Sequence, residues 1–311
     1  MVKKVWIVNY TGEQVEYNIE GVDVENNNGL FITEIEGLGP TGADIIFTKM
    51  VNVDGSLYNS KRINERNIII HGRFLDAETV EEARYKSYRL FPLGKPLQIW
   101  VWTDNRVGFT TGYVEKNEPN IFSSAEDMQI SIVCESPTFV DGNGQTIDHF
   151  SNTEALFEFV YENEGMEPNT EFGNYIENRI CQINYRGEGE VGYRMIIYDQ
   201  GPGGCEDPEL FFHRTGERLT FKLTHIWEEL HHGMLPGDFI ELVVLDKEKG
   251  CYYHSVDTAR NFNIINDVEG IATFSWPKLV PGDSNKFTIT AIPNSDDLKV
   301  YVSYLTEYQG V

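Results

Sequence analysis

The chain has 311 residues, which at about 150 residues per domain predicts two domains, and its 41% hydrophobic content is too high for a disordered chain. Its formal net charge of −24, from 25 basic and 49 acidic residues, excludes a general binder of nucleic acid or of anionic membranes, because both need clustered positive charge. No apolar run approaches the roughly 18 residues of a membrane helix, and the residues after the first lysines are too polar for a signal peptide.

The first half of the chain is predicted to consist mainly of strands. Alternating or continuous apolar stretches predict them, and Asp54-Gly55 predicts a hairpin turn because glycine accepts positive φ without steric cost. The predicted strands are residues 3–9, 14–19, 44–53, 67–75, 97–103, 107–115 and 128–135.

One helix interrupts these strands, at residues 77–91. Asp76 is its expected N-cap, and acidic residues such as Glu81 occupy the first turn, where the helix dipole favours them. Apolar side chains recur at helical spacing, and Pro92 ends the pattern.

Residues 136–152 are polar and glycine-rich, a composition that predicts an exposed connection between two domains. The predicted domains are residues 1–140 and residues 151–311. In the second half, short strands separated by turn residues predict a β-sandwich or jelly roll. Residues 224–234 could form either a loop or one or two turns of helix. The fold class is therefore mainly β, with one helix in the N-terminal domain. The predicted strands of the second half are residues 155–161, 180–185, 193–198, 218–223, 239–245, 250–255, 286–292 and 298–304.

The four cysteines lie far apart and form no C-x-x-C pair, so they predict isolated thiols in a protein folded in a reducing cytosol. They are Cys134, Cys181, Cys205 and Cys251.

The sequence carries no familiar catalytic or nucleotide-binding motif. The sharpest cluster is His225, Glu228 and His232, which on a helix could share a face and hold zinc with an open position. Its order matches no known zinc signature, so a polar surface segment is the preferred interpretation. We therefore predict no catalytic, cofactor-binding or metal-binding residues, and a metal-dependent or carboxylate-pair hydrolase acting on cell wall is kept only as a rival.

A second rival is a carbohydrate-binding module that contacts the host cell surface. Trp227, Trp276 and the many tyrosines could stack on sugars, but the galectin pattern H-x-N-P-R followed by W-G-x-E-x-R is missing. Core or interface aromatics are preferred. Exposed, coplanar aromatic rings on one face of the second domain would favour sugar binding, and burial of the two tryptophans would weaken it.

Four short motifs of the first half, taken in their order along the chain, form a pattern that can be compared with known families. They are GPTGADI at 39–45, VDG at 53–55, NERNIIIHGRF at 64–74 and RLFPLGKPL at 89–97. This series resembles the N-terminal belt domain of the distal tail proteins, often abbreviated Dit, of Gram-positive siphophages. In that family a strand of the form R-x-I-x-I-x-G precedes the one helix.

The second half continues the resemblance with PGDFIEL at 236–242, KGC at 249–251, NII at 263–265 and WPKLVPGDSNKFT at 276–288. This series is similar to the family's C-terminal galectin-like domain. Residues 162–216 match the pattern poorly, and the strong negative charge is less typical.

The resemblance implies a structural hub of a phage tail tip or baseplate rather than an enzyme. In the family, six belt domains close into a ring that continues the tail tube, and the C-terminal domains hold other parts. The implied partners are other copies of the chain in a hexamer, the tail tube protein, and tail-fibre or receptor-binding proteins. The implied location is the virion, after synthesis in the host cytoplasm. Specific nucleic-acid binding is not expected, although DNA could pass through the ring, and an acidic lumen would repel its phosphates.

Overall fold

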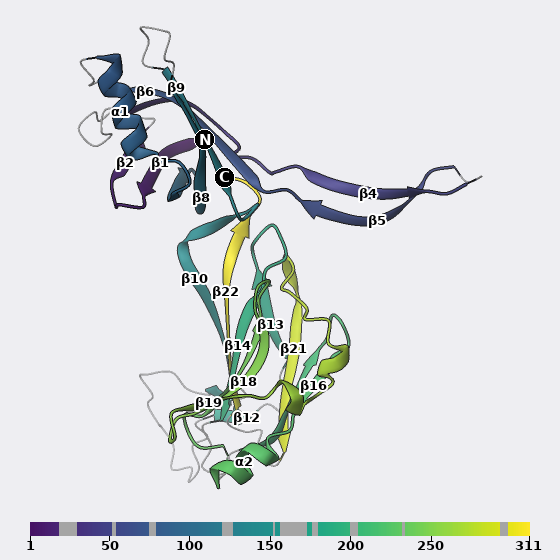
Figure 1. Cartoon of the computed structure of the whole chain (residues 1–311). Helices are drawn as coiled ribbons and strands as arrows, with labels where there is room; N and C mark the ends of the chain where they lie inside the picture. The colour runs from purple at the N-terminus through teal and green to yellow at the C-terminus, as the bar shows by residue number, and fades with distance from the viewer. Residues whose placement is uncertain are drawn as a thin grey trace, which may run out of the picture. The chain divides into compact units, whose positions relative to one another are not determined.

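The computed structural model describes residues 1–18, 30–51, 54–74, 79–119, 127–151, 153–155, 173–175, 180–199, 205–231, 234–292 and 298–311 (Figure 1). These form two compact units, one of Met1–Gly144 with Glu307–Val311 and one of Gln145–Thr306. The chain therefore passes between the units twice. The predicted second domain, residues 151–311, differs from the second unit at its end, because the last five residues pack within the first unit.

The first unit is built around an antiparallel sheet whose strands alternate buried and accessible side chains. Pairing places Val5 opposite Val101 and Ile70 opposite Ile130, so the buried residues of neighbouring strands meet in one core. The order runs β2-β1-β7-β8-β9-β6-β3, with β10 also paired to β8 and β4 paired to β5. The strands are β1 (Val2–Asn9), β2 (Gln14–Asn18), β3 (Leu30–Glu36), β4 (Ala43–Lys49), β5 (Ser56–Ile63), β6 (Arg66–Phe74), β7 (Pro96–Thr103), β8 (Val107–Pro119), β9 (Asp127–Cys134) and β10 (Phe139–Ser151).

The helix of this unit, α1, spans Val80–Leu90. Its N-cap is Thr79, whose hydroxyl accepts a hydrogen bond from the Glu82 amide at 3.2 Å. The predicted cap, Asp76, lies outside the described residues. The helix ends just before Pro92, as predicted, and it buries Leu90 and smaller residues of the same stripe.

The predicted connection at 136–152 contains the division between the two units, at Gly144 and Gln145, but most of it is a strand, β10, in place of a loop. Val140 pairs with Phe109 of β8, and Phe139 is fully buried. Gly142 lies so close to β8 that an added Cβ would stand 2.5 Å from Val107 Cγ1. Gly142 is therefore needed because a side chain would collide with β8, although the sequence pattern suggested a flexible loop.

A buried arginine fastens the last residues of the chain to the first unit. The Arg66 guanidinium donates hydrogen bonds to the carbonyl oxygens of Gly37, of Gly39 at 2.7 Å, of Pro137 at 2.7 Å and of Gln309 at 2.6 Å. Its side chain is 0% exposed, and burial lowers its pKa. The invariably charged group thus replaces its water shell by four backbone carbonyls from three separate segments.

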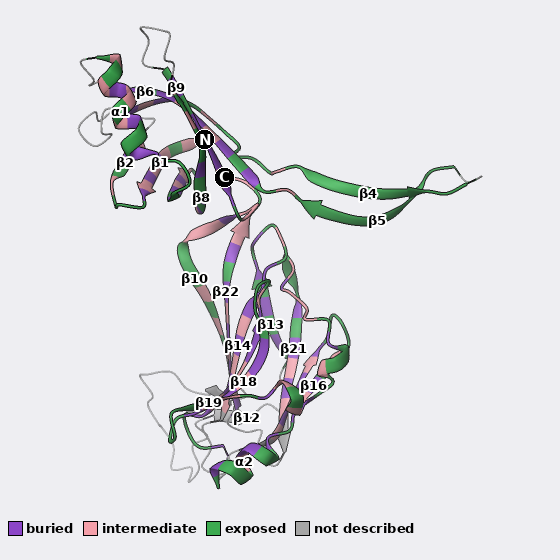
Figure 2. Cartoon of the chain, viewed as in Figure 1, coloured by how far each residue is buried: buried purple, intermediate pink, exposed green. Residues whose placement is uncertain are grey.

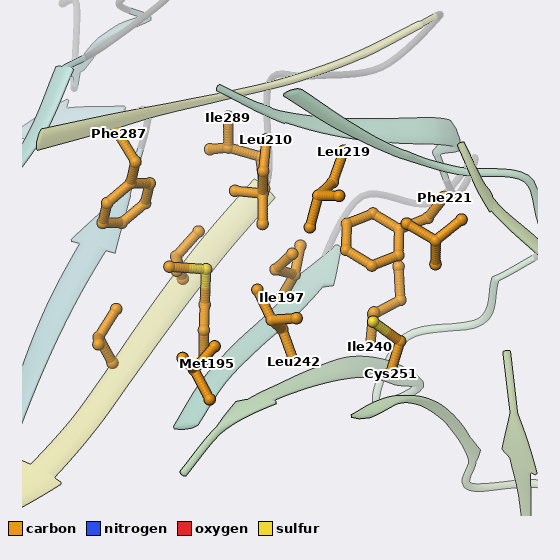
Figure 3. Close-up of a cluster of buried hydrophobic side chains, with 14 of the residues drawn as sticks. Met195, Ile197, Leu210, Leu219, Phe221, Ile240, Leu242, Cys251, Phe287 and Ile289 are labelled. Carbon is orange, nitrogen blue, oxygen red and sulfur yellow. The ribbon is translucent and has the colours of Figure 1, made fainter. Parts of the chain in front are cut away.

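The second unit is a sandwich of two antiparallel sheets, in the orders β19-β18-β17-β14-β22 and β13-β21-β15-β16-β20. Figure 3 shows its core, where Met195, Ile197 and Leu242 of one sheet meet Leu210 and Phe287 of the other. Cores of this kind, with alternating inward side chains from two sheets, define a β-sandwich, and the mainly β fold class is confirmed.

The elements of the second unit are two to 11 residues long within the unit. They are β11 (Thr153–Ala155), β12 (Gly173–Tyr175), β13 (Ile180–Tyr185), β14 (Tyr193–Asp199), β15 (Glu206–Phe212), β16 (Glu217–Phe221), α2 (Thr224–Leu230), β17 (Phe239–Val244), β18 (Lys249–Ser255), β19 (Arg260–Asn263), η1 (Ile265–Asp267), β20 (Val268–Glu269), η2 (Ile271–Thr273), β21 (Gly282–Ile292) and β22 (Leu298–Tyr308).

The PGD motif before β17 places the Asp238 carboxylate at the centre of a group of hydrogen bonds. The Asp238 carboxylate is 0% exposed and accepts hydrogen bonds from the Leu235 amide at 2.9 Å, the Tyr253 hydroxyl at 2.7 Å and the Val256 amide at 2.7 Å. Burial and the hydrogen bond to Asp238 raise the pKa of Tyr253. The motif is therefore structural, since the carboxylate is used entirely in holding the turn and β18 together.

Candidate assembly surfaces

The β4–β5 hairpin exposes apolar side chains along its whole length. Every residue of both strands is exposed, as the green ribbon of Figure 2 shows. Ile45, Phe47, Leu57 and Tyr58 are each between 53% and 55% exposed. The Phe47 and Tyr58 rings contact across the strands with centroids 6.2 Å apart.

The hairpin also presents two open strand edges, because β4 and β5 pair only with each other among the described residues. A two-stranded hairpin is marginally stable in water when nothing packs on it, and open apolar edges invite pairing with another chain. An apolar surface of this length on a protein is typical of an interaction site.

A second apolar surface lies on the β1-β7-β8 sheet, on the side opposite the core. Trp6, Trp100 and Phe109 are aligned across the three strands, and Trp102 stands two residues from Trp100. The Trp100 ring lies 4.6 Å from that of Phe109 and 5.9 Å from that of Trp6, between centroids. We call these four residues the tryptophan face; all four are half-buried.

The tryptophan face makes this sheet apolar on both sides. Val5, Ile7, Ile99 and Val101 of the same strands are at most 2% exposed and face the core. Sheets with two apolar faces are normally covered on both, so the tryptophan face and the hairpin are the two candidate assembly surfaces of the first unit.

The cluster of His225, Glu228 and His232, considered above only as a rival metal site, lies partly outside the described residues. His225 and Glu228 lie on α2, but His225 Nδ1 stands 3.4 Å from Asp267 Oδ1, and His232 lies outside the described residues. Within the described ranges, three or more His, Cys, Asp or Glu side chains nowhere gather to hold a metal ion.

The two tryptophans considered for sugar stacking pack against the sandwich core instead. Trp227 and Trp276 are partly buried beside it, and the Trp276 ring lies 5.3 Å from that of Phe274. Their position weakens the proposal that these two side chains bind carbohydrate.

The four cysteines are free and buried, so the prediction of isolated thiols is confirmed. Burial raises the pKa of Cys251 to about 12 and also raises the pKa of Cys134. The thiols of Cys134 and Cys251 are therefore protonated and unreactive at neutral pH. In the described part of the chain, neither helix has the length and apolar composition that crossing a membrane requires.

Neither candidate surface was predicted from the sequence. The sequence does contain part of the pattern. Trp100 and Trp102 are two residues apart, as are Ile45 and Phe47, so the side chains of each pair lie on the same face of a strand. The neighbouring strands supply Trp6 and Phe109, and their alignment depends on a register that one sequence does not specify.

The structure is similar in fold to solved phage structures. One is the crystal structure of the SPP1 Dit protein (gp 19.1), a paradigm of the hub adsorption apparatus in phages that infect Gram-positive bacteria. The match has a TM-score of 0.60 at 8% identity and covers 97% of this chain and 98% of that one. The phage P2 baseplate in its activated conformation with Ca gives a TM-score of 0.43 at 11% identity, with 100% of both chains covered.

No protein-family model and no curated protein sequence matches the chain. At 8% identity, the likeness to SPP1 Dit is one of fold. The fold predicted from the ordered motifs, a Dit-like two-part β architecture, is confirmed by it.

Proposed function

We propose that the protein is a structural hub of a phage-type tail tip, in which six copies close into a ring that joins the tail tube to the receptor-binding apparatus. The observation that carries this proposal is the β4–β5 hairpin, which is apolar, exposed and open at both edges. The shared fold with SPP1 Dit supports the same role. It also supports a non-enzymatic function and a place in the virion.

Ring closure needs a heterologous contact, in which one surface of each copy meets a different surface of the next. The first unit offers two different accessible apolar surfaces, the hairpin and the tryptophan face. Each copy can therefore donate its hairpin to one neighbour and receive a hairpin from the other. This arrangement covers the open edges and both apolar surfaces at once.

The second unit is then free to hold tail-fibre or receptor-binding proteins, while the first unit meets the tail tube protein. The net charge of −24 would keep DNA phosphates from binding as DNA passes through the ring. Basic residues lining the lumen of the assembled ring would contradict this part of the proposal.

Light scattering on a sizing column, followed by negative-stain imaging, tests the ring. A hexamer of the 35.6 kDa chain with a central hole is expected, and Phe47→Asp should prevent closure by placing a charge on the hairpin. The matched control is Ile147→Asp, which charges an apolar residue that is 59% exposed in the second unit. A wild-type protein that stays monomeric both alone and with the tail tube protein would contradict the ring.

A further inference from the structure

The sheet of β22, β14, β17, β18 and β19 has a second face, opposite the one that packs in the core. Strand pairing aligns Tyr198 with Phe239, Phe239 with His254, and His254 with Asn261 across four strands. The adjacent row aligns Tyr301, through Ile196, with Glu241. We call this surface the outer face; its principal residues are Arg194, Tyr198, Phe239, Glu241, His254, Asn261 and Tyr301.

The rings of the outer face form two parallel pairs. The Tyr198 and Tyr301 rings are 5.1 Å apart with planes 6° apart, and their hydroxyls are hydrogen-bonded to each other. The Phe239 ring and the His254 imidazole are 4.3 Å apart with planes 14° apart. All four side chains are half-buried, so they remain accessible. The rings of each pair stack face against face, so they differ from the exposed, coplanar rings expected of a sugar-binding surface, and their accessible parts offer apolar contact.

A chain of polar side chains runs beside these rings. Glu241 accepts from Arg194 at 2.7 Å through one carboxylate oxygen, and its other oxygen lies 3.0 Å from His254 Nε2. His254 Nδ1 lies 2.9 Å from Asn261 Oδ1, and Arg194 also donates to Glu248 at 2.5 Å. Each side chain is therefore fixed by another before any ligand arrives, which lowers the entropic cost of binding.

The position of the charges indicates the kind of ligand. The centre of a protein–protein interface is depleted of charged residues, whereas Glu241 and Arg194 stand next to the rings. The carboxylates of Glu241 and Glu248 offset the cationic side chains of Arg194 and of Lys299, which is paired opposite Tyr198, so the face has little attraction for an ion. A neutral ligand with many hydroxyl groups fits both the polar chain and the rings.

We propose that the outer face binds a neutral saccharide, a short oligomer of hexose or N-acetylhexosamine units. Sugar hydroxyls would hydrogen-bond to Glu241, to the Asn261 amide and to the tyrosine hydroxyls, while the C–H groups of the sugar ring would lie on the aromatic side chains. This activity goes beyond the hub role and does not require a ring. If the ring forms, its copies would add avidity to a weak single site.

A panel of immobilised neutral oligosaccharides, with acidic oligosaccharides and peptides alongside, is the test. The best-bound sugar is then titrated calorimetrically against the full chain. Asn261→Ala and Tyr301→Ala should each weaken binding about tenfold, the effect of losing one good hydrogen bond or ring contact. Matched controls are Asn105→Ala and Tyr85→Ala in the first unit, which should bind like wild type.

Asn261 is exposed at β19, so its variant should fold even if Tyr301→Ala does not. Thermal unfolding of each variant checks this. No binding to any neutral oligosaccharide at millimolar concentration would overturn the proposal, as would stronger binding to acidic glycans or peptides, or equal affinity in the Asn261 variant and its control. Binding by the Phe47→Asp protein separates this activity from ring formation, because that change lies on the hairpin.

Discussion

Replacing Arg66 with methionine should destabilise the first unit without touching either candidate assembly surface. The side chain makes five hydrogen bonds to four carbonyls, those of Gly37, Gly39, Pro137 and Gln309, and it is 0% exposed. Methionine fills a similar volume but donates nothing, so the four carbonyls lose their partner.

The magnitude follows from two opposing effects. Hydrogen bonds to a charged group contribute about 1.5–3 kcal/mol each, but burying a guanidinium costs several kcal/mol, which the methionine does not incur. Some carbonyls can also regain water at the surface. We expect a net loss of about 3–5 kcal/mol in the free energy of unfolding of the first unit, the range typical of removing one partner from a buried charged contact.

Hydrogen exchange followed by mass spectrometry in increasing urea resolves the two units separately. Peptides from β6 and β9 should lose protection in the Arg66→Met protein, while peptides from β14 and β17 should keep theirs. The control is Arg62→Met, because Arg62 has a side chain that is 78% exposed and stands 3.8 Å from Glu65. If β6 and β9 lose no more protection in the Arg66→Met protein than in the Arg62→Met protein, the reasoning is refuted.

Three further outcomes are expected. Asp238→Ala should cost the second unit about 3–5 kcal/mol by leaving the buried Tyr253 hydroxyl and two part-buried amides unpaired, and Tyr253→Phe about 1–2 kcal/mol, as measured by urea denaturation; equal losses would contradict the hydrogen-bond account. Thr79→Ala should cost about 1 kcal/mol through loss of the helix cap, and Thr79→Ser should restore it in the same assay. Because burial raises the pKa of Cys251 to about 12, its thiol should resist alkylation at pH 8.5 in the folded protein and react after unfolding; rapid labelling of the native chain would show that the site is open.

Local patterns in the sequence were sufficient for most strands and for the single helix of the first unit. The N-cap of the helix was predicted three residues too early, at Asp76. Thr79 and Glu82 form a Thr-x-x-Glu pattern, which is typical of a capping box and identifies Thr79 as the cap. The strand β10 was missed for a different reason. Its glycines suggested a loop, and only the contact between Gly142 and Val107 shows that they are needed for close packing.

The functional surfaces were harder to foresee than the fold. The ordered motifs carried the resemblance, and several of their residues prove to be structural, as Arg66 and Asp238 illustrate. The outer face brings together Tyr198, His254 and Tyr301 from strands separated by up to 103 residues. Such a constellation depends on the pairing register of several strands, which local periodicity does not determine.

The hydrogen bond from Arg66 to Gln309 spans 243 residues and sets an order for events at the ribosome. The second unit, residues 145–306, lies wholly between these two positions and contains its own core. The first unit, although synthesised first, completes its core only when residues 307–311 emerge. Nascent chains therefore carry an unfinished first unit until residues 307–311 are available.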